Sequence, residues 1–254
     1  MNLFDQFSID YDKMINWEKR LEREGPFFRK IFQDTGAKRV LDLACGTGRH
    51  AVMFAQWGLE VTAMDISGPM VEQTRAAADQ AGVKVEALQG GFLDFRQKVQ
   101  GKYDVILILG NSLPHLLTRE EIAKCLADVA GALNPGGRLI LQNRNYDKVL
   151  AEQERFMPLN AWSGPDGEEV LFLRFMDWQG ELVNFNLVTL HKQDGKWSYH
   201  VGTNPLRPIT SGEMRSYLQK AGFQGAVWYG DYGFNPYNSQ ASGDIIVVAG
   251  PEQE

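Results

Sequence analysis

Short apolar runs alternate with longer segments of helical periodicity over the first 142 residues of the chain. The apolar runs cover residues 40–43, 60–65, 84–89, 103–109 and 138–142. Between them, apolar residues recur three or four positions apart, as Ile122, Leu126 and Val129 do within Glu120–Leu133. This alternation predicts a parallel sheet that is covered by helices on both faces. The run Tyr103–Leu109 is almost wholly apolar, so we expect it at the centre of that sheet.

The C-terminal part of the chain predicts one more helix and two further strands. The segment Thr210–Ala221 has helical periodicity, and its first residue is spaced from Glu213 as in a capping box. The runs Phe223–Tyr229 and Asp244–Ala249 are expected to pair as an antiparallel hairpin that closes the sheet. The fold class predicted for residues 1–254 is a single α/β domain, built on a Rossmann-like doubly wound sheet of about seven strands with the last strand antiparallel.

Two segments do not follow the strand–helix alternation. Residues 1–38 are expected to form an N-terminal helical cap, interrupted at Gly25-Pro26. Residues 151–206 alternate apolar and polar positions, which predicts an inserted antiparallel β segment. Its expected strands are Val170–Asp177, Leu182–Leu190 and Lys196–Val201, with turns at Pro165-Asp-Gly, at 179–180 and at 194–195. The pattern leaves three roles for this insertion open: a lid, a wall of the substrate pocket, or a contact in an oligomer.

Composition and charge narrow the class of protein. The 254 residues are 44% hydrophobic and 23% charged, as in globular proteins, and their net charge is −6. No block of Lys and Arg is present, which disfavours a nucleic-acid partner, and no apolar run is long enough for a membrane span or signal segment. Two cysteines, Cys45 and Cys125, fit a reducing cytosol better than a disulfide framework. We therefore expect a cytoplasmic protein, and the histidine spacing predicts no metal site.

The segment Arg39–His50 combines a short buried strand, a turn of small residues and the start of a helix. Small residues at positions 44, 46 and 48 let a ligand approach the backbone, and the N–H groups at the helix start point at it. This arrangement is typical of a nucleotide site, although it lacks the G-x-G-x-x-G spacing of dinucleotide enzymes; an ordinary strand–turn–helix is the alternative. Asp65 ends the second strand, where a carboxylate typically accepts hydrogen bonds from ribose hydroxyls. Its alternative role is to cap the helix that begins near Ser67.

Chemistry is expected in the loop after the central strand, because ligands bind at the carboxyl ends of parallel strands. That loop contains Asn111, whose carboxamide can donate a hydrogen bond to a substrate amine or accept one from it. It also contains His115, which can reach a cofactor. A helix cap is the alternative for Asn111, and a structural role is the alternative for His115.

Two features resemble known families. The turn Asp42-x-x-x-Gly46-x-Gly48, with Ala44 where a first glycine is common, resembles the S-adenosylmethionine site of class I methyltransferases. The loop Gly110-Asn-Ser-x-x-His-Leu, together with Arg144-Asn-Tyr-Asp after strand five, resembles the glycine and sarcosine N-methyltransferases within that class. The first resemblance covers nearly the whole chain, whereas the second rests mainly on these two loops and on Tyr199.

The resemblance implies S-adenosyl-L-methionine as the cofactor and assigns residues to its site. The implied cofactor-binding residues are Tyr11, Arg20, Ala44, Gly46, Asp65, Ile66, Met70, Gly91, Phe92, Leu109 and His115. In the family, an N-terminal segment folds over the methionine end, which points to Tyr11 and Arg20; a surface helix is their alternative. Ile66 and Met70 are expected against the adenine, with core packing as the alternative. Gly91 stands where these enzymes usually have Asp or Asn, so backbone groups of Gly91 and Phe92 are expected to read the adenine edge instead.

The resemblance also assigns residues to the acceptor side. Those expected to be catalytic are Asn111, Arg144 and Tyr199. Arg144 matches an arginine that grips the substrate carboxylate, which suits the planar guanidinium; a surface salt bridge to Asp147 or Glu152 is the alternative. Tyr199 matches a tyrosine that lines the pocket, with an edge-strand aromatic as the alternative. Phe185 falls where the family tends to have another tyrosine, which argues against glycine itself as the substrate.

These observations predict methyl transfer from S-adenosylmethionine to the nitrogen of a small amine or amino acid. One alternative is a methyltransferase for another small acceptor, at oxygen or carbon. A second is a protein that binds S-adenosylmethionine without catalysis, and a third, weaker one is a dinucleotide oxidoreductase. No residue need act as a dedicated base, which suits an amine nucleophile better than an alcohol.

Overall fold

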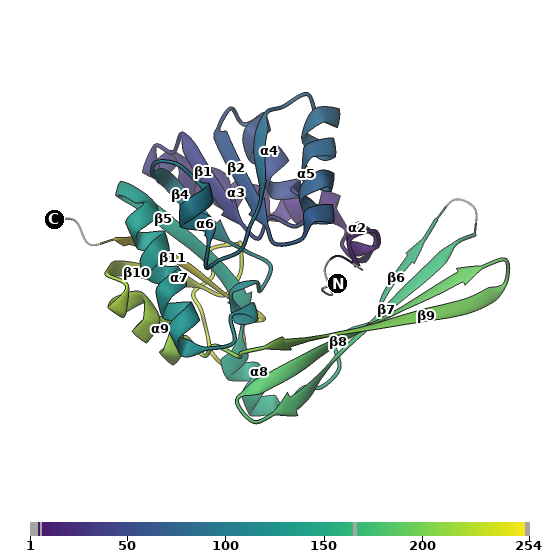
Figure 1. The fold of residues 1–254 in the computed structure, drawn as a ribbon. Helices are drawn as coiled ribbons and strands as arrows, with labels where there is room; N and C mark the ends of the chain where they lie inside the picture. Colours follow the sequence, from purple (N-terminus) through teal and green to yellow (C-terminus); the bar gives the residue numbers. More distant parts are fainter. Residues whose placement is uncertain (1–4, 6, 165–166, 252–254) are drawn as a thin grey trace.

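In a computed structural model of the chain, residues 5, 7–164 and 167–251 are described, and they form two separate β-sheets (Figure 1). The larger sheet has seven strands in the order β10-β11-β5-β4-β1-β2-β3 within this part of the chain. They are β1 (Arg39–Leu43), β2 (Glu60–Asp65), β3 (Val85–Gln89), β4 (Tyr103–Ile108), β5 (Leu133–Arg144), β10 (Phe223–Tyr229) and β11 (Asp244–Pro251). The first five are parallel to one another, whereas β11 is antiparallel to both β5 and β10. The predicted α/β fold class is confirmed.

Helices cover both faces of this sheet, as predicted for a doubly wound fold. They are α2 (Tyr11–Met14), α3 (Trp17–Thr35), α4 (Arg49–Gln56), α5 (Gly68–Gln80), α6 (Phe95–Lys98), α7 (Arg119–Ala132), α8 (Tyr146–Glu152) and α9 (Ser211–Lys220), with a 3₁₀ turn, η1 (Leu113–His115). Alternate residues of one strand pack on opposite faces: Leu41 of β1 joins the core beneath α7 and α9, and Val40 joins the core beneath α3 and α4. Among the described residues, no helix is both long and apolar enough to cross a membrane.

The predicted interruption at Gly25-Pro26 is wrong, because α3 runs unbroken from Trp17 to Thr35. Proline removes one backbone hydrogen bond from a helix interior, but tertiary packing can override that local cost. Phe27 and Phe28, directly after the proline, are fully buried against the main sheet. Gly25 faces Met53 and Trp57 closely enough that a Cβ there would lie 3.7 Å from the Trp57 ring. The helix therefore continues because its apolar face is held by α4 and its neighbours.

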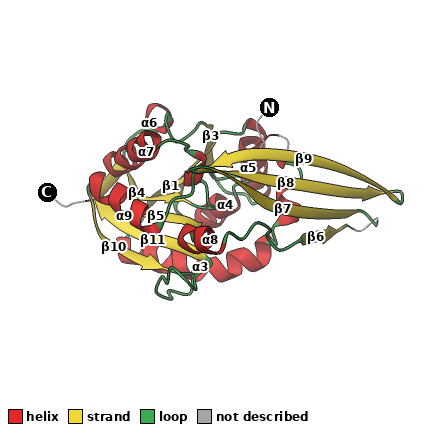
Figure 2. Ribbon diagram, turned by 90° about the horizontal axis from the view of Figure 1, so that it is seen from below, coloured by secondary structure: helices red, strands yellow, loops and turns green. Residues whose placement is uncertain are grey.

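The second sheet contains four strands within the described residues, in the order β6-β7-β8-β9. They are β6 (Asn160–Ser163), β7 (Glu169–Gln179), β8 (Leu182–Gln193) and β9 (Lys196–Leu206). The prediction of three strands is wrong: β6 is too short to show alternation, and β9 continues five residues beyond Val201. The predicted turn at Pro165-Asp-Gly lies largely outside the described residues, since 165 and 166 are not described. Figures 1 and 2 show this sheet as a long twisted arm beside the main sheet.

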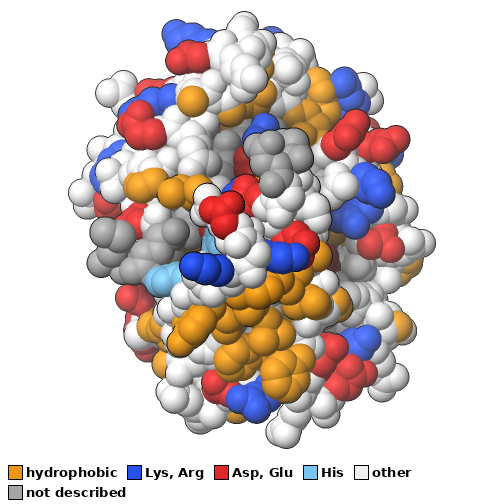
Figure 3. All heavy atoms as spheres, turned by 90° about the vertical axis from the view of Figure 1, so that its right-hand side faces the viewer, with side chains coloured by type: hydrophobic (Ala, Val, Ile, Leu, Met, Phe, Trp, Pro, Cys, Tyr) orange, Lys and Arg blue, Asp and Glu red, His pale blue; other side chains and the backbone are white. Residues whose placement is uncertain are grey.

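One face of the second sheet is turned toward the main sheet and the N-terminal segment. On this inner face, Val170, Phe172 and Leu187 pack with Phe7, and Tyr11 lies against the same cluster. The outer face carries Trp197, Tyr199 and Val201 of β9, all of which are exposed. Figure 3, which views the molecule from the end of this arm, shows hydrophobic side chains gathered on it. The inner face thus forms a wall opposite the carboxyl ends of the main strands.

Candidate functional site

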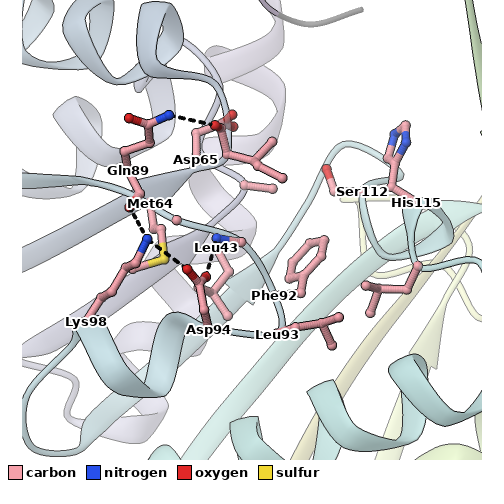
Figure 4. Close-up of a pocket in the computed structure, with 15 residues that line it drawn as sticks. Leu43, Met64, Asp65, Gln89, Phe92, Leu93, Asp94, Lys98, Ser112 and His115 are labelled. Carbon is pink, nitrogen blue, oxygen red and sulfur yellow. Dashed lines mark hydrogen bonds and ion pairs between the residues drawn. The ribbon is translucent and has the colours of Figure 1, made fainter. Parts of the chain in front are cut away.

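Two connected cavities lie at the carboxyl ends of the parallel strands. The first has a volume of about 540 Å³ and the second about 310 Å³. Both are lined by Ala44, Asp65, Ser112 and His115, so they form one cleft. Figure 4 shows the first cavity, with Asp65 on one side and Ser112 and His115 on the other. The cleft is at the edge where an α/β sheet binds its ligands.

The turn between β1 and α4 has a backbone that few residue types can adopt. Ala44, Gly46 and Gly48 all have positive φ, of 71°, 57° and 74°. A Cβ at Gly48 would lie 2.5 Å from Cγ2 of Thr74, so only glycine permits this approach of α4 to α5. Thr74 also donates a hydrogen bond to the carbonyl of Gly46 at 3.0 Å. The small residues are therefore required by the turn itself, and Ala44 and Gly46 line the cleft as predicted.

Asp65 ends β2 and holds the turn in place. Its two carboxylate oxygens accept hydrogen bonds from the N–H groups of Gly46 and Ser67, both at 2.9 Å. Burial raises the pKa of this carboxyl. The cap of α5 is Ser67, whose hydroxyl accepts from the N–H of Met70, so Asp65 is not itself the helix cap. Asp65 lines both cavities, so its carboxylate stays a predicted acceptor for ribose hydroxyls.

The larger cavity is mostly apolar. Ile66, which is 58% exposed, and Phe92 both line it. The N–H of Gly91 donates to Oδ1 of Asp94 at 2.7 Å, and Asp94 is paired in turn with Lys98 at 2.8 Å (Figure 4). The backbone N–H expected to read an adenine edge is thus already engaged. Asp94, which the sequence analysis did not single out, brings a carboxylate to this cavity.

Two predicted cofactor residues do not line the larger cavity. Met70 is buried and lines the smaller cavity, so it is not beside Ile66 in the larger one. Leu109 is 4% exposed and belongs to the core between the sheet, α3 and α4; it lines neither cavity. Leu109 packs in the core because β4 ends at Ile108 and the cleft is reached only at Gly110, which has a positive φ of 70°.

The N-terminal segment lies directly over the turn. Tyr11 and Arg20 both line the smaller cavity, and Tyr11 would be 3.6 Å from a Cβ at Gly46. Asp12 fastens the segment: its carboxylate accepts from Trp17 Nε1 at 2.7 Å and from the Thr47 hydroxyl at 2.8 Å, and it pairs with Arg49. Asp12 gave no signal in the sequence, because two of these three partners, Thr47 and Arg49, lie more than 30 residues further along the chain.

Arg20 is oriented by a buried acid. Its Nε donates to Oε1 of Glu24 at 3.0 Å, and the other oxygen of Glu24 lies 2.9 Å from Nε2 of His50. Glu24 is 1% exposed, and burial lowers the pKa of His50. The i, i+4 spacing of Arg20 and Glu24 could have indicated this pair. A guanidinium fixed in this way can present its remaining donors to an anion in the cavity.

The loop after β4 is joined to the end of β5 by Asn111. Its Oδ1 accepts from the backbone N–H of Arg144, and its Nδ2 donates to the Tyr146 hydroxyl, both at 3.0 Å. Asn111 has a positive φ of 59° and caps no helix, so the cap alternative is wrong. The Arg144 side chain lines the smaller cavity, and within the described residues it makes no ion pair with Asp147 or Glu152. Tyr146, two residues after Arg144, is a site residue that the sequence analysis missed.

His115 lines both cavities and is held by the second sheet. Its Nδ1 lies 2.7 Å from Nδ2 of Asn204 in β9, so the amide donates to the ring. Burial lowers the pKa of His115 to about 4, which keeps the imidazole neutral at pH 7. This contact joins the β9 wall to the loop after β4.

Tyr199 does not line the cleft, and its predicted role there is wrong. It is 75% exposed and pairs with Leu190 on the outer face of the second sheet. Side chains alternate along a strand, so Tyr199 shares the outer face with Val201, whereas Leu206 reaches the cavity from the inner face. Phe185 does line the smaller cavity, together with Met176 and Arg174 of β7.

The arrangement fits the cofactor that the resemblance implies. The apolar cavity lined by Ile66 and Phe92 suits an adenine, the Asp65 carboxylate suits a ribose, and the smaller cavity offers Arg20 to a carboxylate. Beyond that end, Asn111, Arg144 and Arg174 surround space for a second small molecule. These assignments remain predictions about ligand contacts, but the residues are brought to one cleft.

Comparisons with known proteins agree with this arrangement. Residues 40–137 match a family described as a methyltransferase domain. The chain is 34% identical over 230 residues to a glycine/sarcosine N-methyltransferase of Aphanothece halophytica, covering 89% of this chain and 81% of that protein. It is 31% identical to the enzyme of the same name from Halorhodospira halochloris, with 90% and 81% covered. A solved S-adenosylmethionine-dependent methyltransferase of Clostridium acetobutylicum has the same fold, with a TM-score of 0.79, 18% identity, and 98% and 99% of the two chains covered.

Proposed function

The chain belongs to the class I S-adenosylmethionine-dependent methyltransferases, and from this premise we propose that it methylates the nitrogen of a small amine that carries a carboxylate. Its relatives named glycine/sarcosine N-methyltransferases support nitrogen as the acceptor atom. The acceptor is a small molecule. The observation that supports an amine with a carboxylate is the hydrogen bond between Arg144 and Asn111, which lie at the carboxyl ends of β5 and β4 and line the smaller cavity.

The cofactor is S-adenosyl-L-methionine, and the two cavities suggest how it is held. Ile66 and Phe92 would contact the adenine, and Asp65 would accept hydrogen bonds from the ribose hydroxyls. Tyr11 and Arg20 would close over the methionine end, with Arg20 facing its carboxylate. The sulfonium supplies an already activated methyl group, so the protein has mainly to align the acceptor. Alignment of this kind is worth roughly 7–11 kcal/mol of a reaction barrier.

Arg144 and Asn111 would position the acceptor. A guanidinium presents a planar fork of donors that matches a carboxylate. Because Asn111 accepts the N–H of Arg144 and donates to Tyr146, the loop that faces the amine is fixed relative to the arginine. Burial raises the pKa of Tyr146 to about 12, so its hydroxyl stays protonated and can accept from Asn111 throughout the physiological range. The alignment would therefore be built into the loops before the acceptor binds.

The amine must lose its proton before it attacks the methyl group. His115 is a poor base, since burial lowers its pKa to about 4. The positive charge of Arg144 at the cavity disfavours an ammonium ion there, which lowers the pKa of a bound amine. Water can then take the proton as the acceptor enters.

Arg144→Ala tests the proposal. With glycine, sarcosine and larger amino acids as acceptors, KM should rise by roughly 10–150-fold, because a charge-assisted hydrogen-bonded pair is lost. The matched control is Arg119→Ala on the surface, where Arg119 pairs with Glu181 away from the cleft. S-adenosylhomocysteine release measures the rate. An unchanged KM in Arg144→Ala, or methylation of phenols and organic acids but of no amine, would contradict the proposal.

A further inference from the structure

A second arginine faces the acceptor cavity from the opposite wall. Arg174 lies in the middle of β7, paired in register with Leu187 of β8. It shares the inner face of the second sheet with Met176 and Phe185, which also line the cavity. The surrounding wall is therefore apolar, and placing a charged side chain in it costs free energy that some interaction must offset.

Arg174 is only partly satisfied by the protein. Its Nη2 donates to the carbonyl of Pro158 at 3.1 Å and to Oδ1 of Asn160 at 3.0 Å. Its Nε is buried and has no hydrogen-bond partner among the described residues. Burial, followed by the positive charge of Arg144, lowers the pKa of Arg174.

The third arginine of the cavity makes an instructive contrast. Arg20 is neutralised by Glu24 at 3.0 Å. Arg144 and Arg174 both line the same cavity, and in the described part of the chain neither has a carboxylate within 4.0 Å. Asp244, the register partner of Arg144, interacts electrostatically with it, but Asp244 does not line the cavity. Arg174 in particular is partly buried with no carboxylate of the described residues beside it, which is costly unless a ligand supplies the negative charge.

We propose that Arg174 is a second anion-binding residue, and that the acceptor is an amino acid with two acidic groups. This inference rests on the proposed function, in which Arg144 holds one carboxylate. An acceptor with a single carboxylate would leave one guanidinium unpaired in an apolar wall, whereas a dicarboxylic amino acid pairs both. Met176 and Phe185 would contact its methylene groups. Chemically, a new N–C bond forms as the S–C bond breaks with its electron pair left on sulfur, and the amine proton goes to water.

Acceptors that differ only in the second charge test this inference. The panel is L-aspartate against L-asparagine, L-glutamate against L-glutamine, and glycine, with S-adenosylhomocysteine release as the readout. For the wild-type protein, kcat/KM should be at least about tenfold higher for one acid than for its amide. In Arg174→Gln that ratio should fall toward one, while kcat/KM for glycine changes by less than about threefold. Arg174→Lys should keep part of the preference.

One further variant and one further measurement complete the test. Asn160→Ala removes a bond to Arg174 but keeps the guanidinium, so it should retain the acid preference if charge is what matters. Equal rates for acids and amides, or an equal loss for glycine and the acids in Arg174→Gln, would overturn the inference and leave the proposed function standing. If none of these amines is methylated, the proposed function fails. The inference is then judged by binding: the S-adenosylhomocysteine complex should be stabilised against melting by the acid more than by the amide, and only with Arg174 present.

Discussion

The side-chain oxygen of Asn111 accepts a hydrogen bond from the backbone N–H of Arg144, with 3.0 Å between the two atoms. This bond joins the carboxyl ends of β4 and β5, which are neighbours in the main sheet. The amide nitrogen of Asn111 is engaged as well, by Tyr146. Asn111 therefore sets the distance between the two loops that would hold the amine and its carboxylate.

We expect Asn111→Gly to lower kcat/KM by roughly 10–100-fold, because a loop displacement of about 1 Å can cost that much in alignment. Glycine keeps the left-handed backbone that Asn111 adopts at φ 59°, so the folded state should lose little stability. Asn111→Ala should lower kcat/KM by the same factor, and its free energy of unfolding should be about 1 kcal/mol lower than that of Asn111→Gly. Steady-state rates and urea unfolding measure the two effects. Full activity in Asn111→Gly would show that the link between the loops is dispensable.

Gly48→Ala should destabilise the protein by several kcal/mol or prevent folding. The new Cβ would lie 2.5 Å from Thr74 Cγ2, at a position whose φ is +74°. Gly58→Ala is the matched control, because φ there is +87° but nothing lies within 4 Å of the added atom. The control should cost only about 1 kcal/mol. Similar urea midpoints for the two variants would contradict the close approach of α4 and α5.

Gly91→Asn should strengthen cofactor binding by roughly 2–10-fold, since a side-chain amide gains a hydrogen bond to the adenine edge. A Cβ at Gly91 meets Ile66 Cδ1 at 3.6 Å and Asp94 Oδ1 at 3.8 Å, which are ordinary contacts. At the adjacent Gly90, a Cβ would lie 2.8 Å from Met64 Sδ, so Gly90→Asn should weaken binding and stability. Calorimetric titration with S-adenosylhomocysteine measures both. Weaker binding in Gly91→Asn would place the adenine elsewhere.

His115 should make the folded state sensitive to acid. Burial lowers its pKa from about 6.5 to about 4 in the folded protein, so its contribution to stability is present above pH 6.5 and is lost as pH falls toward 4. Between pH 7 and pH 5 this amounts to about 2 kcal/mol. Urea unfolding of His115→Gln should show a pH dependence smaller by that amount over this interval. An identical pH dependence in the two proteins would rule out a buried neutral imidazole.

The succession of strands and helices along the chain and most element ends could be predicted because they depend on local pattern. The central strand is almost wholly apolar and is buried on both faces, and β2 ends at Asp65 as predicted. Thr210 and Glu213 form the predicted capping box at α9. Each of these features is set by residues close together in sequence, so one sequence is sufficient to indicate them.

The wrong predictions and the missed residues arise where contacts between distant segments determine the structure. Gly25-Pro26 does not break α3, because the surrounding aromatic core holds the helix together. Tyr199 lies on a strand whose alternation was visible, but alternation alone does not tell which face turns inward. Arg174 and Asp12 act through partners in other segments, so no spacing along the chain could reveal them.

The double engagement of Asp65 limits how this protein can be altered. Its side chain is expected to contact the sugar, and it also connects the glycine turn to the start of α5 through two hydrogen bonds. A substitution there changes recognition and architecture together, and the two losses would be inseparable in any measurement. Engineering the pocket for a modified nucleoside cofactor should therefore begin at Gly91 or Ile66, because their side-chain positions do not connect the turn to α5. The carboxylate of Asp65 should be left unchanged.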